Sequence, residues 1–231
     1  MRQKISIIIP VLNEAQNIQG VLQKLQPLRE NGHEVVLVDG GSKDNTCELA
    51  RSYVDQIMTT DKGRAKQQIS GAKMATGQVF LFLHADSFLP DKADQVILTA
   101  LHTGQSKSSF WGRFNVRLSG NHWLFRIIER SMNWRSCLTG IATGDQAIFV
   151  SRTLYDDVGG IPAIDLMEDI EFSKRLRKLS QVICLKSTVI TSSRRWEKNG
   201  ILKTILSMWY MRLQYFLGVK PEVLANKYYP K

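Results

Sequence analysis

The first hundred residues alternate between two hydrophobic periods, and this alternation limits the possible folds more than any other feature of the chain. Continuous apolar runs at residues 5–10, 35–38 and 79–83 are typical of strands buried on both faces. The segments 15–28 and 65–75 between them carry apolar side chains at helical spacing. Strand and helix in turn, joined by short connections, predict an α/β fold with a mostly parallel central sheet flanked by helices.

The pattern changes after residue 104. Residues 111–118 alternate apolar and polar side chains, which favours an antiparallel or half-exposed strand. Helices are expected at 123–138, 167–179 and 201–217, and short strands at 146–150, 182–185 and 189–191. Because no linker or internal repeat separates the halves, we expect a single domain in which the second half extends the first sheet.

Composition excludes several classes of protein. The chain has 231 residues, of which 43% are hydrophobic and 23% are charged, as in ordinary globular domains. Its three cysteines, Cys47, Cys137 and Cys184, are widely spaced and odd in number, which argues against a disulfide scaffold and a paired-cysteine metal site and indicates a reducing compartment. The apolar run at 5–10 is too short for a signal peptide, so we expect a cytoplasmic protein.

The net charge of +10 is concentrated near the end of the chain. Residues 186–231 hold nine basic and two acidic side chains, or +7 of the total. Such a segment fits nucleic acid, an anionic membrane or a phosphorylated ligand. No RNA-recognition signature accompanies it, so we expect no nucleic-acid partner.

Two segments raise the question of membrane contact. Residues 122–138 and 201–219 combine apolar and aromatic side chains with arginine and lysine. Lys203, Arg212 and Gln214 interrupt the second segment, so a membrane span is not expected. Two alternatives stay open: the helices pack on the sheet or in a homodimer, or they lie peripherally on the inner face of the cell membrane with their basic residues at phosphate headgroups.

Polar side chains follow each of the four early strands. In a parallel sheet the carboxyl ends of the strands share one edge, and ligands bind in the crevice beyond it. Turn formation alone accounts for any one of these groups, but four at one edge predict a binding site. They are Asn13 with Glu14, Asp39 through Ser42, Asp61 through Arg64, and His84 through Asp86.

Several of these residues suggest specific chemistry. Asp86 is a hard oxygen ligand of the kind that Mg²⁺ or Mn²⁺ uses together with phosphate oxygens. Asp39 can accept hydrogen bonds from a base or a ribose, or simply close its own turn, and Ser42 is a plausible N-cap of the following helix. Neither GxGxxG nor GxxxxGK[ST] is present, which argues against the dinucleotide-binding fold and the P-loop.

Two charged clusters occur in the second half. Glu168, Asp169 and Glu171 open a predicted helix, where acids offset the helix dipole by about 0.3–1 kcal/mol each, although one of them can also act as a general base. Arg194 and Arg195 precede Trp196. They fit a clamp for a diphosphate, or a solvated basic turn with the tryptophan in a core.

The order of these pieces resembles family 2 glycosyltransferases of the GT-A fold. The resemblance rests on residues 7–14, 38–46, 82–86 and 168–169 and covers about residues 4–180. The small bacterial transferases associated with radical-SAM and selenium-domain genes, some of them linked to arsenosugars, look most similar. The resemblance implies a nucleotide-sugar donor, a hydroxyl acceptor and a divalent metal, Mg²⁺ or Mn²⁺. It also implies a nucleotide-binding half at 1–104, an acceptor half at 105–200 and a C-terminal helical extension at 201–231.

The same resemblance implies roles for individual residues. Asp39 would contact the nucleotide base, uracil in the first instance, beside the loop from Pro10 to Glu14. Asp86 would hold the metal, and Asp169 would be the catalytic base beside Glu168. The remaining donor-binding positions are Pro10, Asn13, Glu14, Gly41, Gly63, Arg64, His84, Ala85, Arg194, Arg195 and Trp196.

Two positions depart from the family pattern. His84 replaces the first acid of the DxD motif, and Ser192 stands where the QxxRW motif has glutamine. The main prediction is an inverting, metal-assisted transferase. The alternatives are a nucleotidyltransferase, which would need a glycine-rich and basic loop after the first strand, and a catalytically weak nucleotide-sugar-binding protein.

Overall fold

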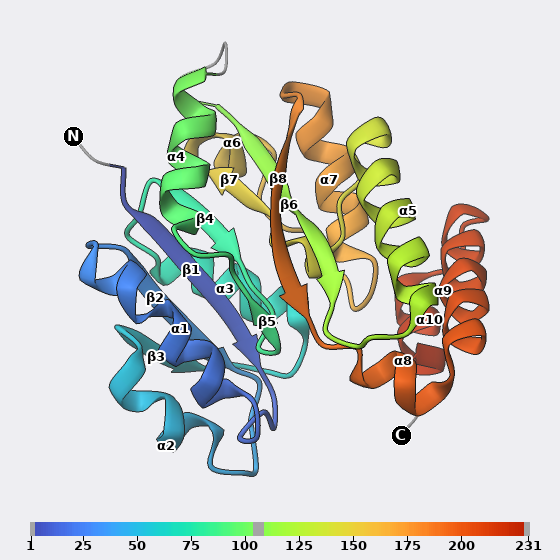
Figure 1. The fold of residues 1–231 in the computed structure, drawn as a ribbon, viewed down its shortest axis with the longest axis horizontal. Coiled ribbons are helices and arrows are strands. Elements are labelled where there is room, and N and C mark those ends of the chain that lie inside the picture. Colours follow the sequence, from blue (N-terminus) through green and yellow to red (C-terminus); the bar gives the residue numbers. More distant parts are fainter. Residues whose placement is uncertain (1–2, 104–108, 229–231) are drawn as a thin grey trace.

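One eight-stranded sheet runs through the computed structural model, which describes residues 3–103 and 109–228 (Figure 1). Its strand order is β3-β2-β1-β4-β7-β6-β8-β5. The strands are β1 (Ile5–Val11), β2 (Glu34–Asp39), β3 (Gln56–Thr59), β4 (Val79–Phe82), β5 (Ser87–Phe88), β6 (Trp111–Leu118), β7 (Phe149–Ser151) and β8 (Val182–Thr191). The helices are α1 (Ile18–Glu30), α2 (Thr46–Ala50), α3 (Arg64–Met74), α4 (Ala93–Thr103), α5 (Trp123–Thr139), α6 (Arg152–Asp157), α7 (Glu168–Leu179), α8 (Arg194–Asn199), α9 (Ile201–Phe216) and α10 (Pro221–Tyr228), with short 3-10 turns at Arg51–Tyr53 and Gly144–Gln146.

The parallel half of the sheet confirms the prediction from the hydrophobic pattern. Strand β1 pairs in parallel with both β2 and β4, and β2 pairs in parallel with β3. The apolar side chains of these strands are buried on both faces. One core cluster lies under α1, α2 and α4, and the other lies under α3, α6 and α7. The carboxyl ends of β1, β2 and β4 therefore meet at one rim, where the polar loops begin.

The second half of the sheet differs from the sequence prediction in two respects. Strand β7 joins β4 and β6 by antiparallel pairing, but β6 and β8 are parallel to each other. The predicted strands at 182–185 and 189–191 are one ten-residue strand that pairs with β6 across an irregularity between Arg113 and Asn115. The alternation in β6 does not mark a half-exposed strand, because Arg113 is buried and donates to the carbonyl of Asn133 at 2.6 Å.

A buried carboxylate ties the start of β2 to its neighbours. The Glu34 side chain is 5% exposed and forms an ion pair with Lys4 at 2.9 Å. Its oxygens also accept hydrogen bonds from the hydroxyls of Ser6 and Thr76 and from the amide of Gly77. These contacts bring the pKa of Glu34 down to about 2 against the opposing effect of burial. Glu34 thus links β1, β2 and the turn before β4.

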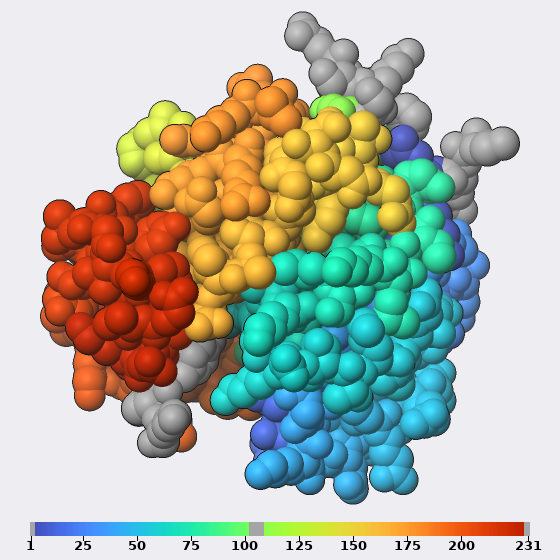
Figure 2. Space-filling model, turned by 180° about the vertical axis from the view of Figure 1, so that it is seen from behind, coloured from blue at the N-terminus to red at the C-terminus, as the bar shows by residue number. Residues whose placement is uncertain are grey.

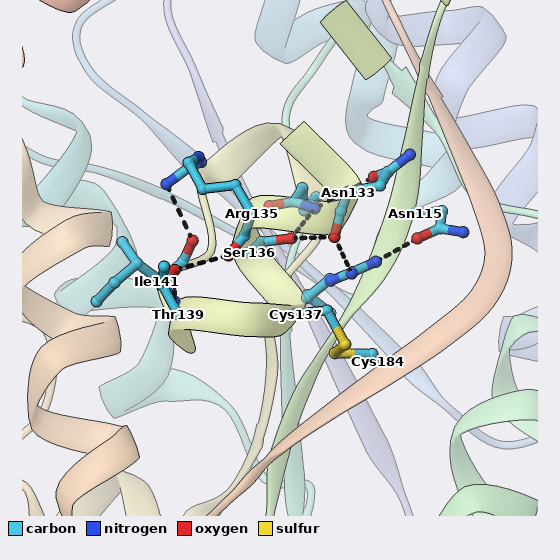
Figure 3. The surroundings of a disulfide bond; sticks show 10 residues. Asn115, Asn133, Arg135, Ser136, Cys137, Thr139, Ile141 and Cys184 are labelled. Carbon is cyan, nitrogen blue, oxygen red and sulfur yellow. Dashed lines mark hydrogen bonds between the residues drawn. A yellow bond between two sulfur atoms is a disulfide. The ribbon is translucent and has the colours of Figure 1, made fainter. Parts of the chain in front are cut away.

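Cys137 and Cys184 form a disulfide that joins α5 to β8 (Figure 3). The sequence argument against a disulfide was therefore wrong for this pair, because 47 residues separate two positions that the packing of α5 brings together. Cys47 has no such bond. The disulfide removes the argument for a reducing compartment, so localisation stays a prediction.

The C-terminal helices form one edge of the molecule, shown in red in Figure 2, away from the blue N-terminal residues. Ile201, Ile205 and Met208 of α9 pack around a small core of Leu118, Phe125 and Trp196, together with Ile128 of α5. Within the described part of the chain, none of the helices has both the length and the apolar character that a membrane span requires.

Candidate functional site

The loops that follow β1 and β2 are joined at the rim of the sheet. Asn13 has a left-handed backbone with φ of 54°, and its side-chain oxygen accepts from the amide of Lys43 at 2.8 Å. The amide of Asn13 donates to Ser42 Oγ at 2.8 Å, and the amide of Glu14 donates to Thr46 Oγ1 at 2.8 Å. The segment from Pro10 to Glu14 is therefore held beside the segment that follows Asp39.

Asp39 is buried at the end of β2 and closes its own turn. Its carboxylate accepts hydrogen bonds from the amides of Gly41 and Ser42 at about 3.0 Å and from the hydroxyl of Ser42. The prediction that Ser42 caps the next helix is wrong, because α2 begins at Thr46 and Ser42 Oγ instead contacts Asp39 and Asn13. The turn fixes the orientation of the carboxylate, and contact between Asp39 and a base stays a prediction.

Glu168 and Arg64 connect two elements that are far apart in sequence. Gly63, with φ of 146°, precedes α3, and Arg64 begins the helix. Arg64 Nη1 lies 3.5 Å from Glu168 Oε1 at the start of α7, where the Glu168 side chain is 6% exposed. Burial raises the pKa of Glu168, and the Asp169 carboxylate adds to the rise, while Arg64 opposes it. The pair directs the guanidinium of Arg64 toward the front of α7.

Asp169 lies beside the loop that precedes β7. The amide of Gly144 donates to Asp169 Oδ2 at 3.0 Å, and Oδ1 accepts from the amide of Ile170 at 2.7 Å. Met167, with φ of 68°, turns the chain immediately before α7. Gly144, Glu168, Asp169 and Phe82 line the same small cavity. The carboxylate is thus oriented by backbone amides and is only half-buried.

His84 is paired with Asp145 through one nitrogen of its ring, and its role in binding stays a prediction. Its Nδ1 lies 3.2 Å from Asp145 Oδ1, and its buried Nε2 has no hydrogen-bond partner among the described residues. A Cβ added to Gly144 would be 2.4 Å from this Nε2, so the imidazole packs directly on that glycine. Burial would raise the pKa of Asp145, but its hydrogen bond with His84 and the charges of His84, Arg64 and Arg195 lower it instead.

Asp86 presents a carboxylate that no other described residue engages. It is half-buried in the turn after β4, next to the buried Ala85. No cluster of three or more histidine, cysteine, aspartate or glutamate side chains with metal-binding geometry occurs in residues 3–103 and 109–228. Asp86 therefore fits a Mg²⁺ or Mn²⁺ site in which one carboxylate is combined with substrate phosphates and water.

The three residues 194–196 have three different environments. Arg194 Nη2 lies 3.6 Å from Glu14 Oε2, which links α8 to the loop after β1. The Arg195 guanidinium stacks on Tyr228 at 3.7 Å. Trp196 is buried against Phe125, as the alternative of a core tryptophan predicted. The two arginines thus reach the rim from the second half of the chain, and their binding roles stay predictions.

Sequence reasoning missed a second group of side chains near Asp169. Burial, together with the charge of Arg212, lowers the pKa of Arg135 to about 10, while Asp169 opposes this effect. Arg135 Nη1 donates to the carbonyl of Ile141 at 3.4 Å, and its Nη2 has no hydrogen-bond partner in the described structure (Figure 3). Tyr215 donates to Glu171 Oε2 at 3.1 Å. Helical spacing is the signal that the sequence offers for these arginines. Arg135 follows Ile128 by two turns and Arg212 follows Ile205 by two turns, so each arginine lies on the same side of its helix as that isoleucine.

Asp145 was also missed as a site residue. Its contact with His84 arises only when the turn at Gly144–Gln146 lies beside the end of β4. Contacts now join these groups in series: Arg64 with Glu168, Asp169 with Gly144, and Asp145 with His84. The structure therefore brings most of the predicted site residues to one rim.

Comparison with known proteins agrees with this arrangement. The sequence profile of "Glycosyl transferase family 2" matches residues 6–158. A "PGL/p-HBAD biosynthesis glycosyltransferase" from Mycobacterium bovis is 26% identical, with 98% of this chain and 91% of the relative covered. A "Dolichol-phosphate mannosyltransferase" from Pyrococcus furiosus is 27% identical, with 79% of this chain and 53% of the relative covered.

Solved structures show the same fold. TarS (residues 1–349) from S. aureus superposes with a TM-score of 0.66 at 18% identity, covering 82% of this chain and 60% of that chain. The mannosyltransferase PcManGT from Pyrobaculum calidifontis, solved with GDP-Man and Mn²⁺, gives 0.62 at 20% identity and covers 82% and 57%. These neighbours are GT-A glycosyltransferases, and the narrower likeness to the radical-SAM-associated group stays a prediction. The chain belongs to glycosyl transferase family 2 and is an enzyme of the transferase class.

Proposed function

We propose that this protein is an inverting glycosyltransferase that moves a sugar from a nucleotide diphosphate, with UDP as the first candidate, to an acceptor hydroxyl. The observation that carries the proposal is the series of contacts from Arg64 through Glu168 and Asp169 to the loop that holds His84. Asp86 lies two residues after His84, so acidic, basic and metal-binding candidates occupy one rim. Residues 1–104 would bind the nucleotide, 105–200 the acceptor, and 201–231 form a helical extension.

The chemistry follows from where charge changes during transfer. The acceptor oxygen forms a bond to the anomeric carbon while the bond from that carbon to the diphosphate breaks, so a single displacement inverts the centre. Asp169 accepts the proton that the acceptor hydroxyl loses. The electron pair of the broken bond leaves with the nucleoside diphosphate, whose charge Arg64 and Arg194 can offset.

A divalent ion, when bound, would supply further charge neutralisation at the diphosphate. Asp86 would hold it with phosphate oxygens, because this carboxylate has no competing partner among the described residues. Structural neighbours with the same fold support this donor class: TarS was solved with UDP and with UDP-GlcNAc, and PcManGT with GDP-Man and Mn²⁺.

Calorimetric titration with UDP in the presence and absence of Mn²⁺ tests the donor and metal assignments. We expect Mn²⁺ to strengthen UDP binding to the wild-type protein, Asp86→Ala to remove this gain, and Asp91→Ala to retain it, because Asp91 is exposed and outside the rim. Equal Mn²⁺ dependence in wild type and Asp86→Ala would contradict the metal assignment. A thermal-shift screen of UDP-, GDP- and dTDP-sugars identifies the donor, since ligands of the native state raise its melting temperature.

A further inference from the structure

Helices α5 and α9 expose an unusual number of large apolar side chains. Of the fifteen large hydrophobic residues that are exposed in the described part of the chain, ten belong to these two helices. Trp134 and Trp209 are 71% and 68% exposed. We call this surface the α5–α9 face; its residues are Trp123, Ile127, Trp134, Leu138, Leu202, Leu206, Trp209, Tyr210, Leu213 and Phe216.

The two exposed stripes point in the same direction. Leu202, Leu206 and Leu213 recur at helical spacing on α9, whereas Thr204 and Met211 on the opposite side are buried. The equivalent pattern on α5 exposes Ile127 and Trp134 and buries Phe125 and Ser136. Ile128 of α5 packs with Ile205 and Met208 of α9, so the helices lie side by side (Figure 1). Because each helix buries its inner side against the molecule, both apolar stripes form one outward surface.

Charge on this surface has one predominant sign. Helices α5 and α9 contain five basic residues and a single acid, Glu129. Glu129 is buried and paired with Arg126 at 3.1 Å, so its charge is compensated. Arg130 and Lys203 are exposed beside the apolar stripes, and three exposed lysines lie next to α9 in the sequence or in space, namely Lys198, Lys220 and Lys227.

We propose that the α5–α9 face docks on the surface of an anionic lipid bilayer. Apolar and aromatic side chains enter the boundary of headgroups and acyl chains, while arginine and lysine contact the lipid phosphates. Docking of a second copy on this face is disfavoured, because it would bring two positively charged faces together. A nucleic acid would contact the basic residues but would leave the aliphatic stripe of Leu202, Leu206 and Leu213 in water.

The proposed orientation has a consequence for the catalytic rim. Arg135 lies on the side of α5 that faces α9, and Arg212 lies on the side of α9 that faces α5. The charges of both Arg212 and Asp169 act on Arg135. A bilayer against the α5–α9 face would therefore lie close to the acceptor side of the rim. The docking proposal goes beyond the proposed function and does not require it, because the surface can bind lipid without a donor.

Vesicle flotation with the full-length protein tests the proposal without any nucleotide sugar. The probe is vesicles of phosphatidylcholine and phosphatidylglycerol in equal amounts, compared with phosphatidylcholine alone. We expect the wild type to float with the anionic vesicles, more weakly as salt rises. The double variant Leu206→Glu with Leu213→Glu should bind at least about tenfold more weakly, because it removes apolar contact and adds negative charge. Lys203→Gln should reduce binding about fivefold.

Leu179→Glu is the matched control, because Leu179 is equally exposed but lies at the end of α7. It should float like the wild type. Unchanged melting temperatures would show that the α9 variants remain folded. The proposal is overturned if the wild type binds neither kind of vesicle, if it binds both equally, or if Leu179→Glu weakens binding as much as the double variant. It is also overturned if sedimentation shows a dimer that the double variant dissociates while vesicle binding is absent.

Discussion

Replacing Glu34 with glutamine should destabilise the parallel half of the sheet. The carboxylate is 5% exposed, pairs with Lys4 and accepts hydrogen bonds from Ser6 and Thr76. These contacts lower its pKa from 4.5 to about 2. A shift of this size corresponds to about 3.4 kcal/mol of folding free energy at neutral pH. Glu34→Gln is therefore expected to lower the free energy of unfolding by about 3 kcal/mol.

The effect should depend on pH in a defined direction. Because the pKa is lower in the folded state, the ionised carboxylate stabilises the protein fully above its unfolded pKa of 4.5, and this stability is lost as the pH falls toward about 2. The contribution is about 3.4 kcal/mol at neutral pH and about 1.4 kcal/mol near pH 3. The difference in free energy of unfolding between wild type and Glu34→Gln, measured by urea unfolding, should therefore be smaller near pH 3 than at neutral pH.

A matched control is available in Glu30→Gln, since Glu30 is exposed at the end of α1 and should change stability little. At neutral pH, the melting temperature of Glu34→Gln should fall by about 2–4 °C per kcal/mol, or roughly 6–12 °C. A Glu34→Gln variant as stable as wild type at neutral pH, or a gap that does not change with pH, would refute the reasoning.

The other predictions concern the disulfide and the packing of His84. Cys137→Ser should lower the free energy of unfolding by about 4 kcal/mol from chain entropy, because the bond closes a 47-residue loop. Dithiothreitol should lower the urea midpoint of the wild type but not of this variant. Equal midpoints for reduced and oxidised wild type would contradict the prediction. Gly144→Ala should cost about 1–3 kcal/mol and weaken UDP binding, because its Cβ would lie 2.4 Å from His84 Nε2. Gly20→Ala is the control and should be neutral or stabilising, because nothing lies within 4 Å of the added Cβ. If Gly144→Ala is as stable as Gly20→Ala, the packing of His84 on Gly144 is contradicted.

Sequence patterns predicted the parallel half of the fold well because its apolar runs are buried on both faces. Residues 5–10, 35–38 and 79–83 correspond closely to β1, β2 and β4. At residues 111–118 the antiparallel alternative is confirmed by the pairing of β6 with β7, but the half-exposed alternative is wrong, because a buried arginine looks like a solvent-facing one in sequence. Arg113 is accommodated by Asn115 and by the carbonyl of Asn133, which approaches from α5. Such tertiary contacts leave no local signal.

The candidate site was predictable where residues follow strands and unpredictable where loops meet. The position after a strand singled out Asp86, and the family resemblance singled out Asp169 among the three acids that open α7. The contact of Asp145 with His84 depends on how the turn before β7 lies beside β4, and the position of Arg135 depends on the packing of α5 against α9. The disulfide belongs to the same class, since α5 and β8 meet only in the folded chain.

The most direct test of the central claim compares Asp169→Asn with Asp165→Asn, an exposed acid four residues earlier. The measurement is release of nucleoside diphosphate from the sugar nucleotide that binds best, with water or an identified hydroxyl as acceptor, alongside calorimetry for donor binding. We expect Asp169→Asn to bind donor nearly as well as wild type but to turn over about 10²–10⁴-fold more slowly, while Asp165→Asn remains active. Turnover by Asp169→Asn at the wild-type rate would contradict the assignment of Asp169 as the base.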